Sequence, residues 1–139
     1  MTNTLIKISC TIDAPVAHVW DVHTTPEHIV NWNFASADWC CPYADVDLRS
    51  GGRYLARMEA KDGSFGFDYE GIYHIVEAPH KSVLILGDGR KVETVFTPDD
   101  GGTRVQVSFD ADTNAPLEMQ QDGWQSILNS FKERCEATV

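Results

Sequence analysis

Three polar side chains on one predicted strand could carry acid–base chemistry. Asp68, Glu70 and His74 occupy alternate positions between residues 65 and 76, so they share one face of an extended strand. Turned inward, they would form a carboxylate–imidazole cluster suited to general acid–base catalysis. The opposite face is aromatic, however, and burying two unpaired carboxylates is costly. We therefore expect all three to face solvent. A cyclase or hydrolase that uses them remains an alternative, which a one-residue shift in register would favour.

Three histidines, His18, His23 and His28, recur every five residues. Two histidines that share a metal on a helix need a spacing of three or four residues, whereas five residues turn a helix by about 140°. These side chains therefore do not converge, and we interpret them as surface or capping histidines.

The four cysteines, Cys10, Cys40, Cys41 and Cys135, show no C-x-x-C spacing, which favours reduced thiols in a cytosolic protein. The adjacent pair has no cation nearby in sequence, so we expect inert thiols. The chain contains no G-x-S-x-G, phosphate-loop or dinucleotide-binding motif. Nothing in these residue types demands catalysis, and we expect neither a metal nor a cofactor.

Charge and composition exclude several partners. The chain has 139 residues and a formal net charge of −10, which would repel nucleic acid and anionic membranes. It contains no apolar run of the ~20 residues that a membrane span needs, and its N-terminus does not resemble a signal peptide. We therefore expect one cytoplasmic domain, residues 1–139, as a monomer or weak dimer.

One long helix, from Pro116 to Ala137, is the element around which the chain is organised. Asn114 or Ala115 would cap it, with Pro116 in its first turn. Within it, Gly123 lowers helix propensity, and we favour tight packing or a slight bend there over the alternative that it lines a cavity. Apolar residues recur at helical spacing and predict one buried face: Leu117, Trp124, Ile127, Leu128, Phe131 and Cys135.

The preceding residues predict a sheet and two short helices. Residues 5–12 alternate as a strand, and short helices follow from residue 15 and over residues 25–32, the first with His23 on its inner face. Residues 33–43 indicate a loop or an ill-formed helix, and residues 45–49 a strand. Further alternating runs separated by short turns continue to residue 111. The order predicts an α+β fold, with a curved antiparallel sheet of six or seven strands wrapped on the C-terminal helix.

At this level of detail the chain resembles the START-like, or SRPBCC, superfamily with its helix-grip fold. Within it, the chain is most similar to homologues of the heat-shock-chaperone ATPase activator. The resemblance covers nearly the whole chain and rests on segments taken in order: Ile12 to Trp20, Thr25 to Trp32, Asp47 to Tyr54, Tyr69 to Pro79, Gly101 to Val107 and Asp122 to Trp124. The resemblance indicates the fold more strongly than the function, because proteins with this fold have many different activities.

The resemblance implies a ligand site between the sheet and the C-terminal helix. Gln120 and Gln121 would supply a polar contact near the start of that helix. The apolar positions that it nominates are also those that a filled core would need, so both interpretations stay open. They are Trp32, Trp39, Tyr43, Tyr54, Met58, Phe67, Tyr69, Tyr73 and Trp124.

We expect non-catalytic binding of a small apolar or aromatic molecule, such as a lipid, a polyketide or a flavonoid-like compound. Trp32, Tyr69 and Trp124 would anchor it. The resemblance also implies an alternative, a module that interacts with a chaperone. The resemblance implies an additional N-terminal module in full-length activators; we expect none in this single domain, which weakens that alternative.

Overall fold

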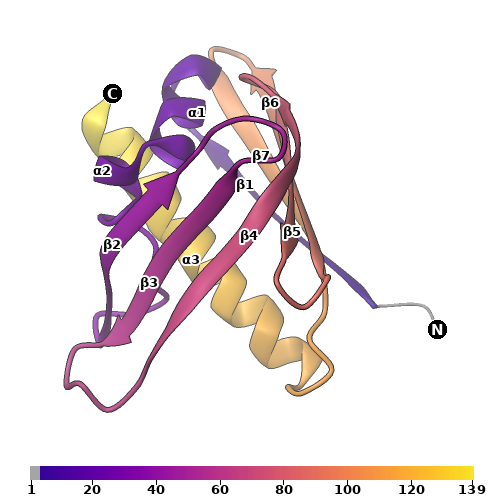
Figure 1. The fold of residues 1–139 in the computed structure, drawn as a ribbon. Helices are drawn as coiled ribbons and strands as arrows, with labels where there is room; N and C mark the ends of the chain where they lie inside the picture. Colours follow the sequence, from indigo (N-terminus) through magenta and orange to yellow (C-terminus); the bar gives the residue numbers. More distant parts are fainter. Residues whose placement is uncertain (1–3) are drawn as a thin grey trace.

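The predicted order of elements is confirmed in a computed structural model that describes residues 4–139 (Figure 1). Residues 1–3, part of the N-terminus in which we expected no signal peptide, lie outside the described residues. The elements are β1 (Leu5–Ile12), α1 (Val16–Thr24), α2 (Pro26–Ile29), β2 (Trp39–Val46), β3 (Arg53–Ala60), β4 (Gly66–Glu77), β5 (Lys81–Leu86), β6 (Lys91–Asp99), β7 (Gly102–Asp110) and α3 (Leu117–Thr138).

The seven strands form one antiparallel sheet in the order β1-β7-β6-β5-β4-β3-β2. Strands β2 to β7 follow one another through short turns, whereas β1 pairs with β7 at the far edge. The α1–α2 segment therefore carries the chain from one edge of the sheet to the other. In Figure 1, α3 runs diagonally across one face of the curled sheet, with α1 and α2 beside its C-terminal half.

The apolar stripe of α3 faces the sheet, as its spacing predicted. Leu128, Phe131 and Cys135 are buried, and the indole of Trp124 stacks on the ring of Phe109, with centroids 4.0 Å apart. Facing α3, alternate residues of β1 and β7 are also buried. Burying a large apolar side chain contributes about 1.5–3 kcal/mol, so these contacts clamp the helix against the strands. The helix-grip architecture expected from the resemblance is confirmed.

The expected loop over residues 33–43 is partly wrong, because β2 begins at Trp39. This edge strand pairs with β3, and its register shifts between Cys40 and Tyr43. A bulge inserts an extra residue and interrupts the two-residue alternation by which a strand is recognised. The strand predicted over residues 45–49 is therefore displaced, and Asp47 to Arg49 lie in the turn that follows β2.

Three expectations about α3 are also wrong. The helix begins at Leu117 with Pro116 at its cap, so Asn114 and Ala115 do not cap it, and Leu117 is 49% exposed rather than buried. At Gly123, a Cβ would meet no atom within 4 Å. Tight packing therefore does not explain this glycine, which lowers helix propensity without allowing a close contact.

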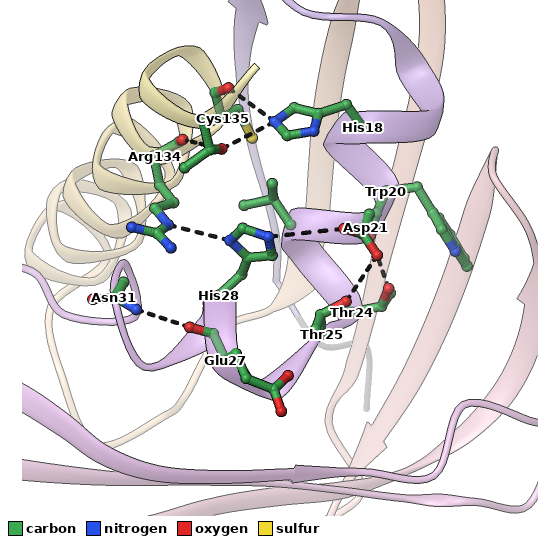
Figure 2. A network of polar contacts seen from close by, with 12 residues as sticks. His18, Trp20, Asp21, Thr24, Thr25, Glu27, His28, Asn31, Arg134 and Cys135 are labelled. Carbon is green, nitrogen blue, oxygen red and sulfur yellow. Dashed lines mark hydrogen bonds and ion pairs between the residues drawn. The ribbon is translucent and has the colours of Figure 1, made fainter.

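A polar network holds the C-terminal end of α3 against the two short helices (Figure 2). Nε2 of His18 lies 3.1 Å from the carbonyl oxygen of Cys135, which is one of the last carbonyls of the helix. Nε of Arg134 donates to Nδ1 of His28 at 3.2 Å, and Nε2 of His28 lies 3.8 Å from a carboxylate oxygen of Asp21. His18 thus has the capping role expected of it, and the network positions α1 and α2 at one end of the space beneath α3.

Candidate ligand-binding cavity

A cavity of about 210 Å³ lies between the sheet and α3. An apolar cavity of ~150 Å³ can bind benzene, whereas drug-sized ligands occupy ~300–1,000 Å³. The space therefore suits a molecule of one or two rings. Its walls are mostly apolar and aromatic and comprise Ile8, His23, Trp32, Asn33, Tyr54, Met58, Phe67, Tyr69, Tyr73, Ser82, Leu84, Val92, Thr94, Val107, Trp124, Ile127, Leu128 and Phe131.

Strands β3 and β4 build the aromatic wall by pairing large residues with small ones. Tyr54 on β3 lies opposite Gly71 on β4, and Ala56 on β3 lies opposite Tyr69. A Cβ at Gly71 would lie 2.6 Å from the backbone oxygen of Ile85, so only glycine fits there. The small residues leave room for the rings of Tyr54 and Tyr69, which meet edge to face with centroids 6.1 Å apart.

One end of the wall is open to solvent. Phe67 lines the cavity and is 41% exposed, whereas Tyr54 and Met58 on the neighbouring strand are buried. On the opposite side, Trp124 is partly buried and meets Tyr69 edge to face with centroids 6.1 Å apart. We therefore place the mouth of the cavity beside Phe67, where a small molecule can enter without opening the sheet.

The cavity carries no ionised side chain near neutral pH. Burial raises the pKa values of the Tyr54, Tyr69 and Tyr73 phenols well above their ordinary range, so they stay neutral. Burial also lowers the pKa of His23 from 6.5 to about 4. The lining contains no Asp, Glu, Lys or Arg. Such a site favours a neutral ligand, because a buried charge needs a partner.

The interpretation of His23 as a surface or capping residue is wrong, although its placement on the inner face of the helix is correct. Its imidazole stacks on the Trp32 indole with centroids 5.6 Å apart and meets the rings of Phe96 and Phe131 edge to face. Among residues 4–139, Nδ1 of His23 is the one buried side-chain nitrogen or oxygen atom without a hydrogen-bond partner. The sequence did indicate this burial, because Trp20 and His23 lie on the same inward face of α1.

Three of the nominated site residues lie outside the cavity. Trp39 packs against Phe67 at the edge of the sheet, with ring centroids 6.2 Å apart. Tyr43 follows the bulge in β2 and is 54% exposed. The Gln120 amide bonds the backbone N–H and carbonyl of Asp112 at 2.7 and 2.8 Å, which closes the loop before α3.

The other nominated residues line the cavity, although no bound molecule tests their role. They are Trp32, Tyr54, Met58, Phe67, Tyr69, Tyr73 and Trp124. Gln121, the second glutamine considered, is exposed. The polar wall residues Asn33, Ser82 and Thr94 were missed. Ser82 and Thr94 stand at inward positions of β5 and β6. The two-residue alternation of side chains along a strand could therefore have predicted that they line the cavity.

The proposed acid–base cluster does not form. Asp68, Glu70 and His74 are exposed on the outer face of β4, as expected. Asp68 pairs with Arg57 at 3.3 Å, and Glu70 pairs with Arg53. The hypothesis of a cyclase or hydrolase that uses these three residues is therefore contradicted. Among residues 4–139, no group of three or more His, Cys, Asp or Glu side chains is placed to hold a metal ion, and no helix is long and apolar enough to cross a bilayer.

Comparisons with known proteins agree with this architecture. The solution structure of the AHSA1-like protein from Aeromonas hydrophila is 43% identical in sequence, with a TM-score of 0.91 over 96% of this chain and 93% of that chain. A solution structure from Cytophaga hutchinsonii is 42% identical, with a TM-score of 0.82 over 95% of this chain and 92% of that chain. A crystal structure of a protein from Nitrosomonas europaea, with 20% identity and a TM-score of 0.84 over 97% and 96%, shares the fold.

A comparison with curated proteins finds no match. The family model described as "Activator of Hsp90 ATPase homolog 1-like protein" matches residues 13–136. This range includes α1, α2, six of the strands in full and nearly all of α3. Together with the helix-grip fold and the relatives above 40% identity, this match shows that the chain belongs to the AHSA1-like family of the START-like superfamily.

Proposed function

We propose that this AHSA1-like domain binds a small, neutral, largely apolar or aromatic molecule between the sheet and α3. The observation that carries the proposal is the apolar cavity of about 210 Å³, because a filled core would have left no such space. Its volume favours one or two rings over a lipid with two acyl chains or a polycyclic polyketide. Binding requires no covalent chemistry and no cofactor.

The anchors of such a ligand would be Trp32 in the turn after α2, Tyr69 on β4 and Trp124 on α3, which all line the cavity. A ligand the size of an indole would bury ~200 Å² of apolar surface. At ~25 cal/mol per Å², that burial is worth about 5 kcal/mol. This free energy corresponds to a dissociation constant on the order of 0.1 mM, so the protein would act as a low-affinity carrier or sensor unless polar contacts add to the binding.

The test is calorimetric titration with indane, a neutral hydrocarbon of two fused rings. The variant Val107→Phe enlarges a buried wall residue and should weaken binding at least ~10-fold, because the ring occupies the space that the ligand needs. The control Ile72→Phe makes a similar change on the outer face of β4 and should bind as the wild type does. The proposal fails if the wild type binds no indane at millimolar concentration, or if Val107→Phe binds it equally well.

A second candidate function is contact with a chaperone, which the family description suggests. The observation that favours it is an exposed aromatic cluster at the turn between β3 and β4. Phe65 is 60% exposed and lies against Trp39 and Phe67, with ring centroids about 6 Å away. Purified Hsp90 should then be retained by the wild-type domain and lost with Phe65→Ser. Equal retention of Hsp90 by both proteins, or by neither, would count against this candidate.

A further inference from the structure

The cavity wall contains one buried side-chain nitrogen that has no hydrogen-bond partner among residues 4–139, and it belongs to His23. The His23 ring lies between Trp32, Phe96 and Phe131, three side chains that offer it no charge. Its Nδ1 atom is buried without a partner. Nε2 of the same ring is not among the buried atoms that lack a partner, and the ring lines the cavity, so this second nitrogen has access to the empty space. A ligand in the cavity is therefore the natural partner for Nε2.

The burial of Nδ1 decides which nitrogen carries the proton. A neutral imidazole has one N–H donor and one acceptor nitrogen. A buried N–H without an acceptor is rarer than a buried acceptor without a donor. We therefore assign the proton of His23 to Nε2, so that Nδ1 keeps its lone pair and the cavity receives a donor. The low pKa of about 4 agrees with a neutral ring.

Charge then restricts the ligand. No Lys or Arg lines the cavity, so a carboxylate would have to obtain a cation by protonating His23. Because the pKa of His23 is about 4, that protonation at pH 7 carries a penalty of roughly 1,000-fold in affinity. Part of it would be regained in the ion pair, but a neutral oxygen acceptor incurs no such penalty.

We propose that Nε2–H of His23 donates a hydrogen bond to a neutral carbonyl or hydroxyl oxygen of the ligand. The cavity thereby selects a one- or two-ring ketone, phenol or alcohol over the matching hydrocarbon and over the matching carboxylate. This inference rests on the proposed function and deepens it by naming the class of molecule.

The experiment compares three probes with one skeleton: indane, 1-indanone and indane-1-carboxylate. Calorimetry at pH 7 should show that the wild type binds 1-indanone about 3- to 10-fold more tightly than indane, the gain of one neutral hydrogen bond. The carboxylate should bind more weakly than indane. In His23→Phe, which keeps an aromatic ring against Trp32, indane and 1-indanone should bind equally. The control His74→Phe removes an exposed imidazole and should keep the wild-type preference.

Nitrogen-15 NMR of the wild-type imidazoles provides a readout that does not depend on the variant folding. The His23 signals should show a proton on Nε2 at pH 7, and 1-indanone should move that proton further downfield than indane does, as a hydrogen bond requires. The inference is overturned if the proton lies on Nδ1, if the wild type does not distinguish the two probes, or if His23→Phe still prefers the ketone. Indane binding in those cases would leave the proposed function standing, whereas no binding of any probe would end both.

Discussion

Acidification should destabilise this protein through His23. Burial lowers the pKa of this imidazole to about 4, against 6.5 for the exposed side chain. The unfolded chain therefore binds a proton between these two pH values that the folded chain does not. The contribution of neutral His23 to the free energy of unfolding is fully present above pH 6.5. It falls as the pH drops through this window and is fully lost below pH 4.

The two pKa values determine the size of the effect. At pH 5 the unfolded imidazole is mostly protonated and the folded one mostly neutral, so the expected loss of unfolding free energy relative to pH 7 is about 2 kcal/mol. The rings that enclose His23 are those of Trp32, Phe96 and Phe131, and none of them titrates in this range. No neighbouring charge therefore offsets the loss.

Urea unfolding of the wild type and of His23→Phe at pH 7 and pH 5 measures this loss directly. Carboxylates also titrate over this range, but they are common to both proteins and cancel in the difference. At pH 7 the variant should be as stable as the wild type or more so, because it replaces a buried unpartnered nitrogen by an apolar ring. At pH 5 the difference should grow by about 2 kcal/mol in favour of the variant. A difference that is the same at both pH values would refute the burial argument.

Further predictions concern α3 and its contacts. Gly123→Ala should raise the free energy of unfolding in urea by up to about 1 kcal/mol, because the new Cβ meets open space in a helix. Gly71→Ala should lower it, because that Cβ would lie 2.6 Å from the backbone oxygen of Ile85. The opposite order of the two variants would contradict the packing. Burial raises the pKa of Cys10 to about 11 and that of Cys135 to about 12, so few of these thiols are thiolates at pH 8. Mass spectrometry after iodoacetamide treatment at pH 8 should therefore show that both are alkylated at least ~10-fold more slowly in the native state than in urea. Arg134→Met should cost about 1 kcal/mol in urea unfolding, since it removes a hydrogen bond between α3 and α2; an unchanged midpoint would show that this bond contributes nothing.

The elements could be predicted because their periodicity is local. Alternation in β7 placed Val105, Val107 and Phe109 on one face, and all three are buried. The edge strand β2 was partly missed because its bulge breaks that alternation. The same bulge explains why Tyr43 lies outside the cavity, since one extra residue changes which side chains point inward.

The wall of the cavity includes seven of the residues that the resemblance nominated. The resemblance nominated Tyr54, Met58 and Tyr69, which stand at inward positions of β3 and β4 and line the cavity. His23 was missed as a wall residue because the spacing of the histidines was compared only with the spacing that a metal site needs. The packing of the inner face of α1 was not considered for it. Its Nδ1 atom lacks a partner because aromatic rings surround the imidazole. Those rings belong to Trp32 after α2, Phe96 on β6 and Phe131 on α3, which are far apart in the chain.

The sequence by itself determined the order of helices and strands, the antiparallel sheet and the inward face of α3, because each follows from residues close together in the chain. Only the tertiary structure decided that a cavity exists and which side chains line it. A filled core and a ligand site use the same aromatic residues and differ in volume, and volume depends on how distant elements approach one another. Here α3 lies across aromatic walls that do not fill the space beneath it, which leaves about 210 Å³ and one unsatisfied imidazole.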